Sequence, residues 1–122
     1  MPGKILIVED DPDIQTLVRN VLAKFYEVRT ANDGLQGLMA IETGFEPDLV
    51  IADIMMPNLD GLTMVKAMRK REATAHVPVI FLTAKSSPQD VVQGINVGAR
   101  HYLTKPFKVD DLVNKVKKLV PP

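Results

Sequence analysis

The stretch LVIADIMMPNLDG, residues 49–61, decides the fold that we predict for this chain. Its first four residues are apolar or small, and the run ends abruptly in a carboxylate, Asp53. A run that is apolar at every position is typical of a strand covered on both faces, as in a parallel sheet with helices on each side. Sheets of this kind bind ligands where their strands end, so Asp53 lies where a functional site is expected.

Length and composition limit the classes of protein to consider. The chain has 122 residues, of which 46% are hydrophobic and 25% charged, as expected for one globular domain. Fifteen basic and fifteen acidic residues cancel, which gives no electrostatic indication of nucleic-acid or membrane binding. The lack of cysteine excludes disulfides and thiolate metal ligands. Since neither a signal peptide nor a membrane span is recognisable, we expect a cytoplasmic domain without contacts to membranes or nucleic acid.

Strand and helix patterns alternate on both sides of this stretch. Apolar runs predict further strands at 5–8 and 77–82. We also expect short strands at 26–31, which is less apolar and so is placed nearer an edge of the sheet, and at 100–103. Apolar stripes at helical spacing predict five helices, covering 14–25, 35–41, 62–68, 91–95 and 112–120. The pattern therefore predicts one α/β domain over residues 1–122, with a five-stranded parallel sheet and right-handed crossovers. We place its core at about 4–119 and interpret 120–122 as the start of a linker.

Polar residues stand where most of the helices are expected to begin. Asp11 precedes Pro12, the pattern of an N-cap followed by proline at the first helical position. Asp33, Asp60 and Asp110 are predicted to begin the second, third and last helices. Ser87-Pro88 is predicted to begin the fourth.

Several polar side chains follow the predicted strands and should meet at one edge of the sheet, because parallel strands all end at the same edge. They are Glu9 and Asp10 after the first strand, Asp53 after the third, Thr83 after the fourth and Lys105 after the fifth. Carboxylates about 5 Å apart repel by roughly 3 kcal/mol per pair at an effective dielectric near 20, and one lysine offsets only part of this. An open site of oxygen ligands with surplus negative charge suits Mg²⁺, with Mn²⁺ as a substitute.

Each of these residues also has an ordinary interpretation when it is taken alone. Acids after strands are often helix caps or solvated surface groups, and we expect Asp11 to be a cap. A lone threonine or lysine at a strand end is usually a turn residue or a solvated charge. The basic residues at 66–71 and 115–118 are interpreted as solvated helix faces. The indication of a functional site is therefore the expected convergence of the acids, Thr83 and Lys105 on one edge, rather than any of these residues alone.

Four motifs stand in the order and separation typical of one family. ILIVEDD, LVIADIMMPNLDG, VIFLTA and YLTKPF together resemble the receiver domain of two-component response regulators, the family of the bacterial chemotaxis regulator. The resemblance extends from Lys4 to about Leu119. It implies a flavodoxin-like doubly wound sheet with strand order 2-1-3-4-5 and five helices.

The resemblance also implies a role for each site residue. Asp53 is the phospho-acceptor, Asp10 a direct metal ligand, and Glu9 a ligand directly or through water. Met55 supplies its backbone carbonyl to the metal. Thr83 and Lys105 contact the phosphoryl group, Thr83 and Tyr102 form the switch, and the bond between Lys105 and Pro106 is expected to be cis.

The implied function is a phosphorelay switch. A sensor histidine kinase or phosphotransfer protein would donate a phosphoryl group to Asp53 in a Mg²⁺-dependent step. The face made by the fourth helix, fifth strand and fifth helix would then bind a downstream protein or output domain until the aspartyl phosphate hydrolyses. Such a domain is not an enzyme towards small molecules, and it is expected to be a monomer or a phosphorylation-dependent dimer.

Other functions are less compatible with the sequence. A haloacid-dehalogenase-like phosphatase needs a second aspartate at the place of Met55, and a flavodoxin-type carrier needs a phosphate loop where this chain has acids. The alternative that stays open is a pseudo-receiver, which binds proteins without cycling. Met55 lacks a group to orient an attacking water and Lys85 adds a second cation, so the sequence does not fix the lifetime of the phosphate.

Overall fold

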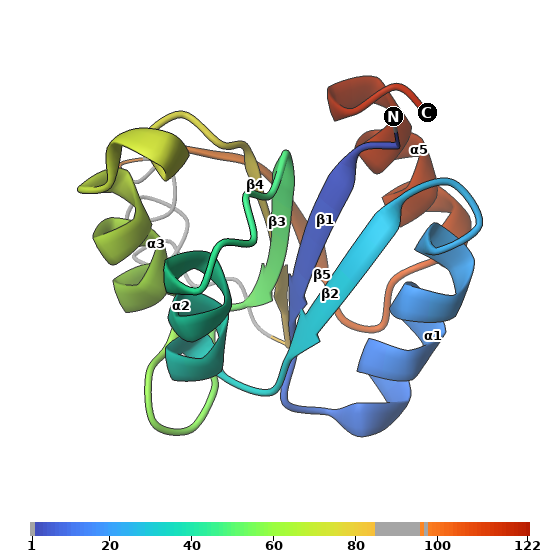
Figure 1. The fold of residues 1–122 in the computed structure, drawn as a ribbon. Coiled ribbons are helices and arrows are strands. Elements are labelled where there is room, and N and C mark those ends of the chain that lie inside the picture. Colours follow the sequence, from blue (N-terminus) through green and yellow to red (C-terminus); the bar gives the residue numbers. More distant parts are fainter. Residues whose placement is uncertain (1, 85–95, 97) are drawn as a thin grey trace.

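A computed structural model describes residues 2–84, 96 and 98–122 of the chain. The elements follow the predicted alternation of strands and helices (Figure 1). The strands are β1 (Lys4–Val8), β2 (Glu27–Ala31), β3 (Leu49–Asp53), β4 (Val79–Thr83) and β5 (Ala99–Thr104). The helices are α1 (Pro12–Leu22), α2 (Gly34–Glu42), α3 (Gly61–Arg69), the 3₁₀ turn η1 (Glu72–Thr74) and α5 (Val109–Leu119).

The five strands form one parallel sheet in the order β2-β1-β3-β4-β5, which confirms the predicted topology. The described residues contain four α-helices instead of the predicted five. The predicted helix at 91–95 lies outside the described residues, as does its expected start at Ser87-Pro88.

The two faces of the sheet are covered by different helices, with α2 and α3 on one side and α1 and α5 on the other (Figure 1). Alternate residues of each inner strand enter the two cores: Leu6 and Val8 lie in one, and Ile5 and Ile7 in the other. Every residue of β3 is buried, because helices cover both faces. The interpretation of residues 49–53 as a doubly covered strand is thus confirmed.

Three of the predicted helix caps form hydrogen bonds at the helix starts. The carboxylate of Asp11 accepts from the backbone N–H groups of Asp13 and Ile14, and Asp33 and Asp60 each accept one at α2 and α3. The prediction for the last helix was wrong by two residues. Its N-cap is Lys108, which forms no side-chain capping bond, and Asp110 lies in the first turn.

The predicted apolar stripes were too wide in two helices. In α1, Leu17 is 47% exposed, and Phe25 lies beyond the end of the helix. In α2, Leu35 and Met39 are about half exposed, while the buried residues include Gly34, Gly37 and Ala40. Small residues are buried there because α2 and α3 lie close together: a Cβ on Gly37 would lie 2.8 Å from the sulfur of Met64.

Two smaller differences concern β4. The strand begins at Val79, two residues later than predicted, because Val77 still donates its backbone N–H to Thr74 at the end of η1. The turn η1 itself was not predicted. Within the described residues, no helix combines the length and apolar character that crossing a membrane requires.

Candidate functional site

The register of the sheet brings the polar residues that follow the strands to one edge. Val8 of β1 lies opposite Ala52 of β3, so the next residues, Glu9 and Asp53, are neighbours. Both are buried, with 0% and 6% of their surfaces exposed, whereas Asp10 is exposed. Thr83, which is 1% exposed, ends β4 one residue beyond the partner of Asp53.

Lys105 joins two of these acids. Its Nζ lies 2.7 Å from Oδ2 of Asp53 and 2.5 Å from Oε1 of Glu9. Its backbone N–H donates to the carbonyl oxygen of Thr83 at 2.7 Å, and this bond holds the backbone of Lys105 beside the end of β4. Lys105 therefore brings a positive charge between two buried carboxylates.

The acidic residues fit a divalent cation. Glu9, Asp10 and Asp53 each offer one carboxylate oxygen, and these oxygens lie within 4.8 Å of one another. The buried Oε1 of Glu9 contacts the Lys105 ammonium but has no well-oriented hydrogen bond. Hard oxygen donors with an incompletely satisfied buried oxygen are compatible with a divalent metal ion.

The charges at this edge perturb one another. Burial raises the pKa of the Glu9 carboxyl to about 7, with the nearby Asp53 adding to the rise and Lys105 opposing it. Burial alone would lower the pKa of Lys105, but its hydrogen bond to Asp53 and its close contact with the Glu9 carboxylate raise it overall. Perturbed pairs of this kind are typical of functional sites.

The remaining predicted site residues differ in how they relate to this cluster. The backbone N–H of Met55 donates to Oδ1 of Asp53 at 3.1 Å, while its side chain is 73% exposed. Tyr102, on β5, is partly buried and its ring lies 5.7 Å from that of Phe81, centroid to centroid. The Lys105–Pro106 peptide bond is cis. Lys85, the second predicted cation, lies outside the described residues.

Sequence reasoning missed the residues that hold the loops around the site. Nε2 of Gln15, on α1, lies 3.0 Å from the carbonyl oxygen of Glu9 and 3.1 Å from that of Ala31. Asp33 was predicted only as a cap, but it also accepts a hydrogen bond from Asn58 in the loop that follows β3. A polar glutamine on an amphipathic helix gives no sign of such a contact, because it depends on how α1 is placed against the sheet.

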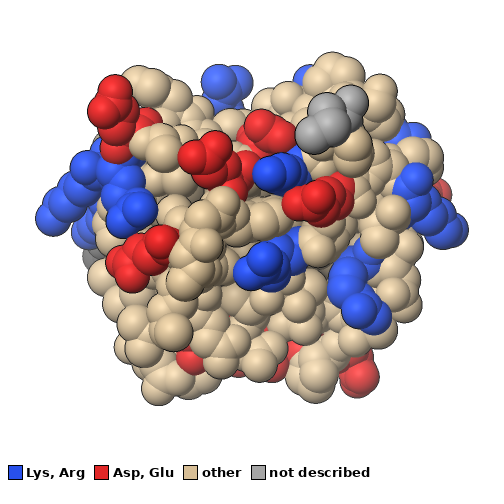
Figure 2. All heavy atoms as spheres, in the orientation of Figure 1, with Lys and Arg blue, Asp and Glu red and all other residues tan. Residues whose placement is uncertain are grey.

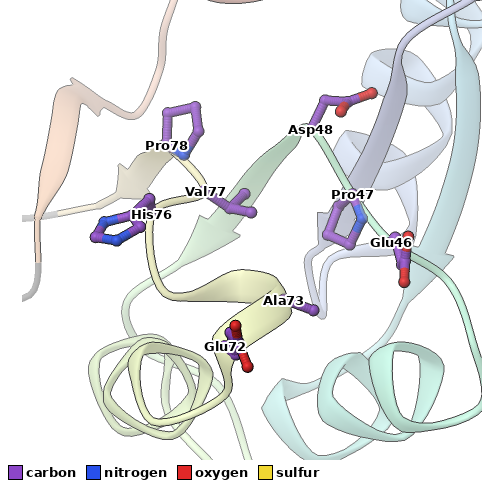
Figure 3. Close-up of a pocket in the computed structure, with 8 residues that line it drawn as sticks. All are labelled: Glu46, Pro47, Asp48, Glu72, Ala73, His76, Val77 and Pro78. Carbon is purple, nitrogen blue, oxygen red and sulfur yellow. The ribbon is translucent and has the colours of Figure 1, made fainter.

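A pocket of about 440 Å³ lies at the opposite edge of the sheet (Figure 3). It is formed by 46–48 before β3, by 72–73 of η1 and by 76–78 before β4. One of its carboxylates, Asp48, accepts the backbone N–H of Lys4 and so has a structural role. We therefore assign the candidate site to the edge that carries Asp53. On the face seen in Figure 2, basic and acidic side chains are interspersed, in keeping with the balanced net charge.

Comparison with known proteins identifies the family of the chain. The sequence model described as "Response regulator receiver domain" matches residues 5–117. The chain belongs to this family. All of the residues at the Asp53 edge lie within the matched part of the receiver domain.

Related proteins include transcriptional regulators. The receiver domain is 42% identical over 118 residues to the DNA-binding dual master transcriptional regulator RpaA of Synechocystis, covering 96% of this chain and 48% of RpaA. It is 45% identical over 115 residues to the transcriptional regulatory protein DltR of Streptococcus agalactiae, covering 93% of this chain and 50% of DltR. The chain thus spans about half the length of these curated relatives.

Solved structures share the fold of this receiver domain. Chemotaxis protein CheY4 of Vibrio cholerae has a TM-score of 0.91 at 32% identity, with 98% of this chain and all of CheY4 covered. The response regulator TrrA of Thermotoga maritima, solved in complex with Mg(2+)-BeF, has a TM-score of 0.82 at 36% identity, with 97% and 99% covered.

Proposed function

We propose that this receiver domain accepts a phosphoryl group on Asp53 from a phosphohistidine of a histidine kinase or phosphotransfer protein. It would thereby act as a switch in a two-component phosphorelay. The observation that carries this proposal is the position of the Lys105 ammonium, 2.7 Å from Asp53, beside a cluster of three carboxylates. One side of Asp53 thus faces a cation from the protein, and the other faces oxygen ligands that suit a metal ion.

In the proposed transfer, a carboxylate oxygen of Asp53 attacks the phosphorus, and the electron pair of the breaking P–N bond returns to the donor imidazole. The Met55 N–H holds Oδ1 of Asp53 and Lys105 holds Oδ2, so the carboxylate is oriented from both sides. Lys105 can then pair with an oxygen of the transferred group, because catalysis of phosphoryl transfer is mainly positioning and electrostatic stabilisation.

Mg²⁺ is the proposed metal, with Mn²⁺ as a substitute. Asp10, Asp53 and the backbone carbonyl of Met55 would hold it, with Glu9 bound directly or through water. When bound, the ion supplies positive charge that neutralises phosphoryl oxygens. The solved complex of TrrA with Mg(2+)-BeF supports this choice of metal by analogy.

The switch would begin with the added charge on Asp53, about −1.5 to −2 by comparison with other phosphorylated side chains. The buried Thr83 hydroxyl would move towards the new oxygens, and the partly buried Tyr102 would turn into the space that is left. The equilibrium between two conformations of the face that includes β5 and α5 would shift. A downstream protein or output domain would recognise the conformation favoured by phosphorylation. The names of RpaA and DltR as transcriptional regulators support an output partner of this kind.

The domain would therefore turn over no small-molecule substrate and would promote only its own phosphorylation and dephosphorylation in the cytoplasm, as a monomer or phosphorylation-dependent dimer. The alternative of a non-cycling binding module is supported by no observation among the described residues. Intact mass spectrometry after incubation with acetyl phosphate and Mg²⁺ tests the proposal. A labile phosphoryl adduct should form on the wild type and not on Asp53→Asn, and no adduct with any donor would contradict the proposal.

A further inference from the structure

We infer that Asp33 and Asn58 are positioning residues for metal binding: their hydrogen bond holds the loop between β3 and α3 so that the Met55 peptide stays beside Asp53. The inference rests on the proposed function only for the role of the Met55 carbonyl as a metal ligand. Neither residue touches the acids of the site in any hydrogen bond described for it. Both act through the backbone between Asp53 and Gly61.

The carboxylate of Asp33 uses its two oxygens for two different purposes. Oδ1 accepts the backbone N–H of Gln36 at 2.8 Å and caps α2. Oδ2 accepts Nδ2 of Asn58 at 2.6 Å, across 25 positions of the sequence. A serine provides the one oxygen that an N-cap needs. The second oxygen of Asp33 is therefore not needed for the helix, and it joins α2 to the loop.

A second contact joins the same two segments directly beside the first. The backbone N–H of Gly34 donates to the carbonyl oxygen of Leu59 at 3.1 Å. A Cβ atom on Gly34 would lie 2.5 Å from that oxygen, so the approach requires glycine. The N-cap Asp33 and the first residue of α2, Gly34, thus bind two adjacent residues of the loop, Asn58 through side chains and Leu59 through the backbone.

The loop has a constrained backbone, and its far end carries the proposed metal ligand. Asn58 has φ = 67°, a left-handed conformation that non-glycine residues adopt infrequently. Gly61 donates its N–H to Ile54 at 2.9 Å and closes the loop at its base. The Met55 side chain is 73% exposed, so side-chain packing contributes little to its position. The Met55 peptide is therefore placed by its own N–H bond to Asp53, by the packing of the neighbouring Met56 against the core, and by the bonds of the loop, to which Asp33 and Asn58 contribute.

Electrostatics keep the Asp33 contact intact near neutral pH. Hydrogen bonds from the Gln36 N–H and the Asn58 amide lower the pKa of Asp33, so its carboxylate stays ionised. Hydrogen bonds to a charged acceptor are stronger than neutral ones. Loss of a group bonded directly to a metal ligand typically lowers metal affinity by about 10- to 100-fold, and we expect about 10-fold, the lower limit, for this more remote contact.

Two variants remove the contact while preserving local structure. Asp33→Ser keeps a cap for α2 but cannot also reach Asn58. Asn58→Gly removes the amide and tolerates the left-handed backbone. Asp60→Ser is the matched control, because Asp60 caps its own helix, α3, at the end of the same loop. We measure the dissociation constant of Mg²⁺ by NMR titration, the melting temperature in EDTA, and the adduct formed with acetyl phosphate at saturating Mg²⁺.

Asp33→Ser and Asn58→Gly should weaken Mg²⁺ binding by about 10-fold and Asp60→Ser by less than about 2-fold. All three should still form the adduct on Asp53 when Mg²⁺ is saturating. Equal Mg²⁺ affinities in the three variants, with only the melting temperatures differing, would overturn the inference and leave the proposed function standing. Wild-type protein that binds no Mg²⁺ would overturn both.

A double variant keeps the test valid if a single one folds poorly. Asp33→Asn combined with Asn58→Asp reverses donor and acceptor and preserves the net charge, while position 33 keeps an oxygen for the cap. Asn58→Asp alone should weaken Mg²⁺ binding, because two facing ionised carboxylates share no hydrogen bond, and the double variant should return to within about 2-fold of the wild type. Failure of the double variant to recover affinity, despite a wild-type melting temperature, would overturn the inference.

Discussion

The ammonium nitrogen of Lys105 lies 2.7 Å from Oδ2 of Asp53, although 52 positions separate the two residues. The contact exists because β3 and β5 end at the same edge of the sheet, with β4 between them. The same nitrogen lies 2.5 Å from the fully buried Glu9. The Lys105 ammonium thus forms ion pairs with two carboxylates. The charge balance of the site therefore depends on Lys105.

Replacing Lys105 by Met should destabilise the domain in the absence of Mg²⁺. It should also increase the gain in unfolding free energy that Mg²⁺ produces. Two buried carboxylates would lose their cation, a loss of about 2 kcal/mol for a pair that keeps some solvent contact. Urea unfolding in EDTA and in Mg²⁺ measures both effects. Lys118→Met, at an exposed position on α5, is the control. An unfolding free energy equal to that of the control in both buffers would contradict the assigned role of Lys105.

The raised pKa of Glu9 predicts how stability depends on pH. Its pKa is about 7 in the folded protein against 4.5 for an unperturbed carboxyl, so the folded state binds more protons between these values. Stability in EDTA should therefore fall as pH rises from about 4.5 to about 7, by at most about 3 kcal/mol from this group. Urea unfolding across this range measures the slope, and Glu9→Gln should flatten it. An unchanged slope in Glu9→Gln would exclude Glu9 as its source.

Replacing Gly61 by alanine should destabilise the domain more than replacing Gly44, although of these two glycines only Gly44 has a positive φ. A Cβ on Gly61 would overlap the carbonyl oxygen of Asp53, whereas nothing lies within 4 Å of one on Gly44. Gly61→Ala should cost about 2 to 3 kcal/mol and disturb the site. Gly44→Ala, at φ = 110°, should cost about 1 kcal/mol from backbone strain alone. Chemical denaturation of both variants gives their losses of unfolding free energy. A larger loss for Gly44→Ala than for Gly61→Ala would count against the close approach at Gly61.

Met55→Asn should alter the lifetime of the phosphoryl group and leave the fold intact. The side chain is 73% exposed, so its replacement should change stability by less than about 0.5 kcal/mol. An amide beside Asp53 could orient an attacking water, which methionine cannot do. The rate of loss of the adduct, followed by mass spectrometry after removal of acetyl phosphate, measures the effect. An unaltered rate would exclude a role for this side chain in hydrolysis.

The strands of the inner sheet were predictable from the sequence, because apolar runs such as residues 49–52 depend on burial alone. The caps at Asp11, Asp33 and Asp60 were also predictable, since an N-cap is a local interaction. The apolar stripe predicted over 14–25 is wider than the buried face of α1, since Leu17 is 47% exposed and Phe25 lies beyond the end of the helix. Periodicity does not show where a helix ends or which of its sides a neighbouring element covers. The second bond of Asp33, to Asn58, depends on how α2 meets the loop after β3, which no local pattern encodes.

The most direct measurement of the central claim is the location of the phosphoryl group. The protein is treated with acetyl phosphate and Mg²⁺ and then with borohydride, which reduces an aspartyl phosphate to homoserine. Peptide mass spectrometry then identifies the reduced position. We predict homoserine at position 53 in the wild type, dependent on Mg²⁺ and lost in Asp53→Asn. Reduction at another aspartate, or at none while an adduct is present, would contradict the assignment of Asp53 as the phospho-acceptor.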